Sequence, residues 1–230
     1  MTVHVLRGRA ETVAADREAS RRLLERAADG DRAVRVWTPH RQVAFGRRDA
    51  NAADYVRARE IASERGFPPV ERSVGGRAVA YDGETTLAFA RAEPVEALRS
   101  GIQSRYDALA DDVAAALGEL GVHVEGGEPA DAFCPGTHSL RLPDGGKVAG
   151  IAQRVTGDGA LVAGVLVVAG REELASLLAD VYDALDVPLD PAAVGSVANG
   201  GGPADPTAVR RTLEDALVGD ADATIERIDG

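Results

Sequence analysis

The run ALVAGVLVVAG, residues 160–170, is the stretch that most restricts how this chain can fold. It is apolar throughout and rich in β-branched valine, which favours a strand over other local structures. A strand on the surface would alternate apolar and polar residues, and this one does not. The run therefore predicts a buried strand, which the rest of the chain must cover.

The surrounding sequence supplies both helices and further strands. Helical spacing of apolar residues predicts helices at residues 16–28, 53–65, 103–119, 172–185 and 207–218. Strand patterns fall at residues 33–38, 42–46, 71–83 (interrupted by glycine), 85–91, 138–142 and 147–154. The turn PDGG predicts a hairpin with Leu142 opposite Lys147, and the strand at 42–46 is expected to pair with 33–38.

These elements together predict an α+β fold, with a mixed, mainly antiparallel sheet covered by helices. A length of 230 residues and a hydrophobic content of 45% are enough for one sizeable core. We therefore expect a single domain over residues 1–230, to which residues 199–230 could add a short helical extension.

The charge balance restricts the partners. The chain has 37 Asp and Glu against 26 Lys and Arg, a net charge of −11. An acidic surplus argues against binding a nucleic-acid backbone, which needs a basic stripe. No apolar stretch reaches the roughly 20 residues that span a bilayer, and no signal peptide is recognisable. We expect a cytoplasmic monomer without membrane contacts, and the acidic, aromatic-poor composition is typical of salt-adapted, halophilic proteins.

Lys147 is the only lysine of the chain, and Cys134 is its only cysteine. All other basic residues are arginines, and at high salt the Debye length falls to about 3 Å, so a retained lysine should have a partner in direct contact. Cys134 excludes an internal disulfide, and its neighbours AFCPG indicate an accessible thiol rather than a small buried hydrophobe. Because a nearby cation favours the thiolate, Lys147 and Cys134 are candidates for one site.

Three glycine-rich clusters are further candidates, at residues 45–49, 72–79 and 147–154. Glycine lets a backbone approach a ligand closely, although each cluster could equally be a tight strand connection. None fits a phosphate-binding pattern. His138, four residues after Cys134, could form a Cys/His dyad or half of a metal site; the other histidines are scattered, so no metal is predicted, and we interpret His138 as a strand or pocket residue.

Three segments, taken in order, resemble the lipoate-protein ligase and octanoyltransferase superfamily, whose catalytic domain shares its fold with biotin protein ligases. RSVGGRAVAYD (72–82) is similar to the family's Arg-x-x-Gly-Gly-x-Ala-Val strand, and VAFGRRD (43–49) to the glycine-arginine segment before it. FCPGTHSLRLPDGGKVAGIAQR (133–154) resembles the branch that moves octanoyl groups between lipoyl-bearing proteins. In that branch a cysteine followed by Pro-Gly precedes a Gly-Lys-x-x-Gly-x-x-Gln-Arg strand.

The resemblance implies that Cys134 forms an acyl thioester, and that Lys147 holds the acyl carbonyl and favours the thiolate. It also implies a substrate-binding set: Gly46, Arg72, Gly75, Gly76, Arg77, Ala78, Val79, His138, Gly150 and Gln153. An apolar tunnel for the acyl chain would be supplied by Ala78, Val79, Val148, Ile151 and the strand at 160–168. Two departures, Glu71 in place of an arginine and Arg77 in place of a small residue, leave the choice between octanoyl and lipoyl chains open.

The leading hypothesis is a cysteine-dependent transferase that places an octanoyl or lipoyl group on the lysine of a lipoyl domain, without a cofactor. The donor would be an acylated glycine cleavage H protein or an acyl carrier protein. The lipoyl-domain partners would be the glycine cleavage H protein and the E2 subunits of 2-oxoacid dehydrogenases. A lipoate-protein ligase, which uses ATP and Mg²⁺ to form a lipoyl-adenylate, is the alternative. Cys134 favours the transferase, because adenylation needs no thiol. A third reading is a non-catalytic protein that binds lipoyl domains.

Overall fold

The computed structural model describes residues 2–72, 75–95 and 101–228, and within them the largest unit is an eight-stranded sheet. Its order is β11-β1-β2-β6-β10-β9-β8-β7. The strands are β1 (Thr2–Arg7), β2 (Arg32–Trp37), β6 (Thr86–Pro94), β7 (Glu125–Gly126), β8 (Ser139–Arg141), β9 (Lys147–Thr156), β10 (Gly159–Val167) and β11 (Asp222–Arg227). The apolar β10 is an inner strand, antiparallel to both β6 and β9.

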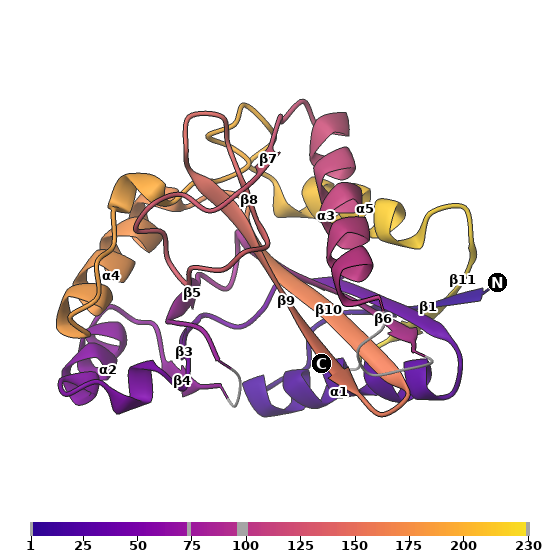
Figure 1. The fold of residues 1–230 in the computed structure, drawn as a ribbon, viewed down its shortest axis with the longest axis horizontal. Coiled ribbons are helices and arrows are strands. Elements are labelled where there is room, and N and C mark those ends of the chain that lie inside the picture. Colours follow the sequence, from indigo (N-terminus) through magenta and orange to yellow (C-terminus); the bar gives the residue numbers. More distant parts are fainter. Residues whose placement is uncertain (1, 73–74, 96–100, 229–230) are drawn as a thin grey trace.

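A second, three-stranded sheet lies beside the large one, in the order β4 (Pro69–Glu71), β3 (Gln42–Phe45), β5 (Val79–Tyr81). The α-helices are α1 (Val13–Ala28), α2 (Tyr55–Glu64), α3 (Ile102–Glu119), α4 (Arg171–Ala184) and α5 (Pro206–Val218). Short 3₁₀ turns cover Asp49–Asn51 and Pro191–Ala193. Figure 1 shows α2 and α4 beside the small sheet, α3 and α5 over one face of the large sheet, and α1 on the other side.

The predicted fold class is confirmed, and each predicted helix is present within a few residues of its expected limits. The pairing expected for residues 42–46 is wrong: β3 pairs with β4 and β5. The reason is that β1 and β6 occupy the two edges of β2. In the hairpin, Arg141 rather than Leu142 lies opposite Lys147, because a bulge after Leu140 shifts the register. Strands β1 and β11 are absent from the prediction.

Side chains alternate between the two faces of the large sheet. Val34 and Val36 of β2 join the core formed with α3 and α5, whereas Ala33 faces α1. Arg35, on the α1 face, is fully buried, and its guanidinium donates to Asp16 Oδ1 at 2.5 Å and to the Gly8 carbonyl at 2.9 Å. Burial lowers the pKa of Arg35, while the Asp16 carboxylate opposes that shift. This buried ion pair fastens α1 to the sheet.

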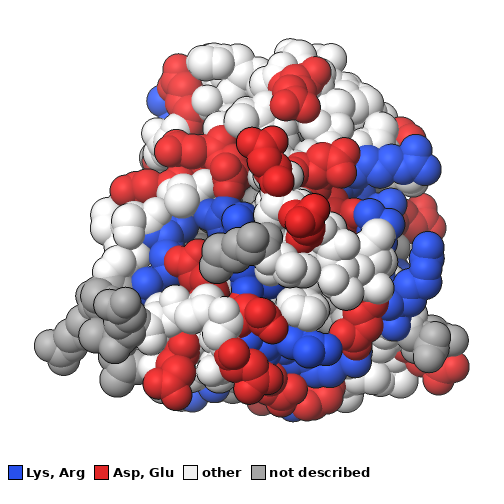
Figure 2. All heavy atoms as spheres, turned by 90° about the vertical axis from the view of Figure 1, so that its right-hand side faces the viewer, with Lys and Arg blue, Asp and Glu red and all other residues white. Residues whose placement is uncertain are grey.

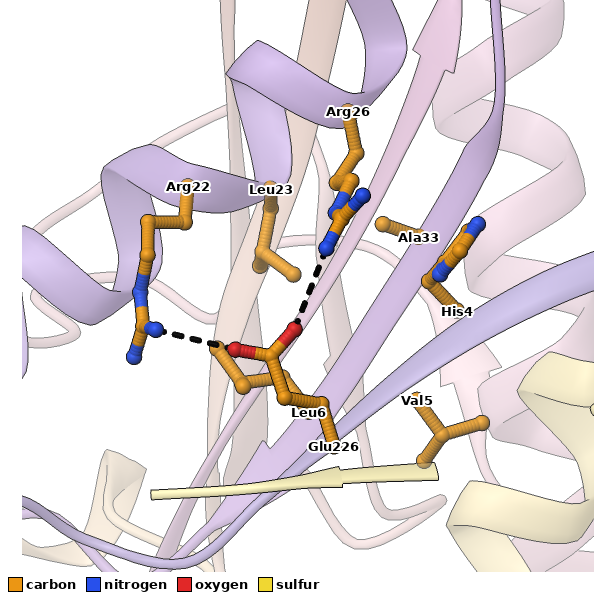
Figure 3. Close-up of a pocket in the computed structure, with 8 residues that line it drawn as sticks. All are labelled: His4, Val5, Leu6, Arg22, Leu23, Arg26, Ala33 and Glu226. Atoms are coloured by element: carbon orange, nitrogen blue, oxygen red, sulfur yellow. Dashed lines mark hydrogen bonds and ion pairs between the residues drawn. The ribbon is translucent and has the colours of Figure 1, made fainter. Parts of the chain in front are cut away.

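Strand β11 closes the sheet at the side of β1, to which it runs parallel. Its Glu226 accepts hydrogen bonds from Arg22 at 2.9 Å and from Arg26 at 3.4 Å, both on α1, beside a small pocket (Figure 3). Helix α5 buries Val209, Leu213 and Leu217 in the main core. The residues after 199 thus contribute a strand as well as a helix to the body of the protein.

The surface carries many charges of both signs. On the face that Figure 2 shows, acidic side chains are spread widely and arginines lie between them. Surface charges form ion pairs, such as Arg59 with Glu71 at 3.2 Å and Arg141 with Glu125 at 2.7 Å. In the described ranges, no helix combines the length and the apolar character that crossing a membrane requires.

The turn between β5 and β6 is held by Asp82, whose carboxylate makes the stability of the protein depend on pH. Its Oδ1 accepts the backbone N–H groups of Glu84, Thr85 and Thr86 at 2.8–2.9 Å, and its Oδ2 accepts the Thr85 hydroxyl. Burial alone would raise the pKa of Asp82, but these donors outweigh burial and lower it. Asp82 therefore stabilises the fold above the pKa it has in the unfolded chain, and this contribution is lost as the pH falls through the folded value.

We predict that Asp82→Asn lowers the free energy of unfolding by about 1–2 kcal/mol at pH 7, because the donors lose their charged acceptor. The difference from the unchanged protein should shrink as the pH falls below about 4, the ordinary range of Asp. Urea unfolding at pH 7 and pH 3 measures both values. Asp144→Asn, at an exposed turn position, is the control and should change stability by less than about 0.5 kcal/mol. An equal loss for Asp82→Asn at both pH values would contradict the prediction.

Candidate active site

The loop between β7 and β8, residues 127–138, carries Cys134 and lies against the small sheet; we call it the Cys134 loop. Cys134 has a φ of +42°, in the left-handed region that few non-glycine residues adopt. Its side chain is half-buried, and its backbone N–H donates to the Tyr182 hydroxyl at 2.6 Å. The backbone of Cys134 is thereby held by a side chain of α4, although the residue belongs to a loop.

Lys147, the first residue of β9, points into the Cys134 loop and is 1% exposed. Its Nζ lies 2.9 and 3.1 Å from the two carboxylate oxygens of Glu128. It also donates to the carbonyls of Phe133 at 2.9 Å and Cys134 at 3.0 Å. A Cβ at position 150 would lie 3.2 Å from Lys147 Cε, so Gly150 leaves room for the ammonium group. The sole lysine has the direct partners that its retention predicts.

The cation that contacts the sulfur is Arg72, whose Nη2 lies 3.8 Å from Cys134 Sγ. This differs from the expectation that Lys147 would stand beside the thiol: Lys147 holds the backbone of the loop instead. Burial disfavours the charge on Arg72, yet the neighbouring Tyr81 and Cys134 outweigh burial and raise the pKa of Arg72. Arg72 therefore keeps its positive charge beside the sulfur.

Two glycine segments lie under the sulfur. A Cβ at Gly76 would come within 2.8 Å of Cys134 Sγ, and one at Gly46 within 2.2 Å of the Gly76 carbonyl oxygen. Gly76 also has a φ of +90°. Asp49 ties the segments together, because its fully buried carboxylate accepts the Gly46 N–H at 2.8 Å and pairs with Arg77 at 3.3 Å. Any side chain at either glycine would displace the backbone or the thiol.

Tyr182 on α4 links the loop to the small sheet. Its hydroxyl accepts the Cys134 N–H and donates to the Ala78 carbonyl at 2.9 Å, and the residue is fully buried. Burial raises the pKa of Tyr182, so the hydroxyl keeps the proton that it donates. Val79, the next residue after Ala78, packs in the same apolar cluster as Tyr182 and Phe133.

Other residues of the predicted set point elsewhere. His138 stacks on Tyr106 of α3, with ring centroids 3.6 Å apart and planes 8° apart. Gln153 accepts from Arg105 at 2.7 Å and donates to the Ile102 carbonyl at 3.0 Å, so it ties β9 to α3. Gly75 is exposed, with open space beside it. Ser73 and Val74 of the same motif lie outside the described residues.

The apolar wall expected for an acyl chain is divided between two clusters. Ala78 and Val79 belong with Cys134 to the cluster around the small sheet. Val148 and Ile151 pack instead with the core of the large sheet. Cys134 packs with the cluster of the small sheet, and its carbonyl accepts a hydrogen bond from Lys147 of the large sheet. It therefore lies at the junction of the two sheets.

Three residues of the site are missing from the sequence-based set: Glu128, Tyr182 and Asp49. Tyr182 had a signal, because it follows Leu174, Leu178 and Val181 on the buried face of its helix, and a buried tyrosine hydroxyl usually has a partner. Glu128 is one acidic residue in an irregular loop, with no pattern that marks it.

The assembled site holds a half-buried thiol, the Arg72 guanidinium beside it, Lys147 of β9 against the same loop, and a floor lined by glycines. Nucleophilic attack by the sulfur on an activated carbonyl needs these groups: a stabilised thiolate and a cation near the developing oxyanion.

The sequence of residues 13–198 matches the model of the lipoyl protein ligase A/B catalytic domain. A protein of Geobacillus kaustophilus named octanoyl-[GcvH]:protein N-octanoyltransferase is 32% identical over 131 residues, which cover 56% of this chain and 44% of that protein. One of the same name from Exiguobacterium sibiricum is 33% identical over 156 residues, covering 66% and 55% respectively. The matched segments thus span about half the length of these relatives.

The crystal structure of lipoate-protein ligase A bound with ATP is similar in fold. Its TM-score is 0.77 at 18% identity, and the match covers 100% of this chain and 90% of that one. An archaeal bi-partite lipoate protein ligase from Thermoplasma acidophilum, solved with its E2 lipoyl domain, has a TM-score of 0.68 at 16% identity and covers 100% and 88%. At these identities the likeness concerns the fold.

We predict that Tyr182→Phe loosens the Cys134 loop, because it leaves the Cys134 N–H and the Ala78 carbonyl without their buried partner. The free energy of unfolding should fall by about 1–3 kcal/mol, measured with urea. Alkylation of Cys134 by iodoacetamide should accelerate, measured by intact mass. Tyr106→Phe is the matched control and should leave the alkylation rate within about twofold. Equal rates for Tyr182→Phe and the unchanged protein would contradict the role of this hydroxyl.

Proposed function

Because the chain belongs to the lipoyl protein ligase A/B catalytic domain family, we propose that it transfers an octanoyl group, through a thioester on Cys134, to the lysine of a lipoyl domain. The observation that carries this proposal is the contact of the Cys134 sulfur with Arg72, in a loop whose backbone Lys147 holds. The names of the two relatives, which describe octanoyl transfer from GcvH to protein, support the same reaction.

In the first half-reaction the Cys134 sulfur attacks the carbonyl of the octanoyl amide on the donor protein. The C–S bond forms, the C–N bond breaks, and the thiol proton leaves with the donor amine. Arg72, 3.8 Å from the sulfur, places a positive charge beside the sulfur as its proton passes to the departing amine. In the second half-reaction the acceptor lysine amine attacks the thioester, which returns the thiol and forms the new amide.

Lys147 stabilises the oxyanion of both tetrahedral intermediates. Its ammonium is already aimed at the Cys134 backbone, so the carbonyl of an acyl group on Cys134 needs to take the place of only one of its acceptors. The floor at Gly46 and Gly76 lets the substrate carbonyl approach without meeting a side chain. The groups that act are therefore Cys134, Arg72 and Lys147.

The partners we propose are lipoyl-domain proteins: the glycine cleavage H protein as donor, and the E2 subunits of 2-oxoacid dehydrogenases as acceptors. The reaction uses no cofactor, because one amide bond is broken on the donor and an equivalent one is formed on the acceptor, while Cys134 carries the acyl group between them. We place it in the cytoplasm, carried out by a monomer.

An ATP-dependent lipoate ligase is the second candidate, and the observation that favours it is the fold likeness to a ligase bound with ATP. The geometry favours the transferase, because adenylation leaves the contact between Arg72 and the Cys134 sulfur without a use. The experiment that follows therefore includes a reaction with ATP, Mg²⁺ and free acid.

We predict that the protein, mixed with octanoylated H protein and no ATP, gains one octanoyl group that hydroxylamine removes. Intact mass under non-reducing conditions measures the adduct, and addition of apo lipoyl domain should discharge it. Cys134→Ser should abolish the thioester and lower transfer at least about a thousandfold, since the nucleophile is lost. Acylation that appears only with ATP, Mg²⁺ and free acid would assign the ligase reaction instead.

Lys147→Arg should lower the rate of Cys134 acylation at least about tenfold. A planar guanidinium is larger than an ammonium and does not fit the space that Gly150 leaves, so the loop must shift. Single-turnover acylation rates measure the loss, with circular dichroism as the check on folding. Full activity of Lys147→Arg would show that a compact ammonium is not required.

A further inference from the structure

Four oxygens accept hydrogen bonds from Nζ of Lys147, the only lysine of the chain. They belong to Glu128, which supplies two, and to the carbonyls of Phe133 and Cys134, all within 3.1 Å. An ammonium has three protons and no lone pair, so it satisfies acceptors on every side. A neutral amine would turn its lone pair towards one of these oxygens. The contacts therefore occupy the protons of Lys147 Nζ and keep this nitrogen turned towards the four oxygens.

Glu128 is the only one of these acceptors that carries a charge. Lys147 is almost completely buried, and burial of an isolated cation favours its neutral form. The Glu128 carboxylate is itself held in place, because its Oε2 accepts the Ser139 hydroxyl and the Gly136 N–H, the latter at 3.2 Å. Glu128 thus provides a fixed negative charge beside Lys147, where the Cys134 loop meets β9.

This matters because a thioester on Cys134 can be attacked by any neutral amine nearby. Lys147 Nζ lies 3.0 Å from the carbonyl oxygen of the same residue that would carry the thioester. If Lys147 were neutral, its lone pair could attack the acyl carbon. The C–N bond would form, the C–S bond would break, and one amine proton would pass to the thiol. The product would be a stable amide on Lys147 and an enzyme lost to further turnover.

We propose that Glu128 is a positioning residue that holds Lys147 Nζ in these hydrogen bonds, so that Lys147 stabilises the oxyanion but cannot capture the acyl group from Cys134. The proposal rests on the proposed function for the source of the acyl group. The low reactivity of Lys147 towards acylating groups follows from its contacts alone, and it can be measured without any acyl transfer.

The first experiment reads the reactivity of Lys147 with N-hydroxysuccinimidyl acetate at pH 8. Peptide mass spectrometry after hydroxylamine counts acetyl groups on amines only. In the unchanged protein, Lys147 should be acetylated at least about tenfold more slowly than the α-amino group of the chain. In Glu128→Gln, acetylation of Lys147 should rise at least about tenfold. Labelling of Lys147 in the unchanged protein as fast as the α-amino group would overturn the proposal, and this arm needs no variant.

Two control variants distinguish the effect of the Glu128 charge from a general loosening of the Cys134 loop. Ser139→Ala removes the hydroxyl bond to Glu128 but leaves the ion pair, so Lys147 should stay protected. Glu125→Gln removes a neighbouring carboxylate that pairs with Arg141, and Lys147 should again stay protected. Glu128→Asp, which keeps the charge, should restore most of the protection. If Ser139→Ala exposes Lys147 as much as Glu128→Gln does, Glu128 acts through packing and the proposal is wrong.

The second experiment follows the acyl group, with 4-nitrophenyl octanoate as donor. Attack by Cys134 forms the thioester and releases 4-nitrophenolate. The unchanged protein should carry only hydroxylamine-sensitive octanoyl, whereas Glu128→Gln should accumulate a resistant octanoyl on Lys147. This amide should disappear when Cys134→Ser is added to Glu128→Gln. A resistant adduct that persists without Cys134, or none in Glu128→Gln, would overturn the capture step.

The two experiments also keep the proposals apart. If the unchanged protein forms no thioester at all, the proposed function fails while the acetylation experiment still decides the role of Glu128. If the thioester forms and Lys147 remains unreactive in Glu128→Gln, the proposed function stands and the role of Glu128 is refuted.

Discussion

A buried ammonium group must have its protons accepted, and much of this site follows from that requirement at Lys147. A lone charge in the interior costs several kcal/mol unless it is paired and hydrogen-bonded. Here the partners come from one loop, which must therefore fold back over β9 to bring Glu128 and two carbonyls to the same nitrogen. The path of that loop in turn fixes where the sulfur of Cys134 lies. Gly150 supplies the space that the arrangement needs.

The site also depends on the meeting of two sheets. The large sheet provides Lys147 and Gly150 from β9, and the small sheet provides Ala78 and the glycine segments beside it. Neither sheet alone holds the thiol. Tyr182 on α4 links the Cys134 loop to the start of β5, because one hydroxyl contacts both the Cys134 N–H and the Ala78 carbonyl. A thiol fixed from two sides in this way is aligned before a substrate arrives, which reduces the entropic cost of reaction.

Local patterns predicted the helices, the buried strand and the hairpin, because each depends on residues close together in the sequence. Strand pairings cannot be predicted in this way, because they depend on segments far apart in the sequence. The local pattern pairs β3 with β2, but the two edges of β2 belong to β1 and β6. At the site, the count of one cysteine and one lysine singled out the central pair. The contact of Arg72 with the sulfur could not be predicted, since it depends on how the Cys134 loop folds onto the small sheet.

The parallel pairing of β11 with β1 has a consequence for the making of the protein. The register joins Thr2 with Asp222, so β1 remains an open edge while almost all other strands are already present. An unpaired edge is a template for association with other chains, and pairing over so long a stretch of chain is intrinsically slow. A ribosome-bound chain must therefore protect this edge throughout synthesis.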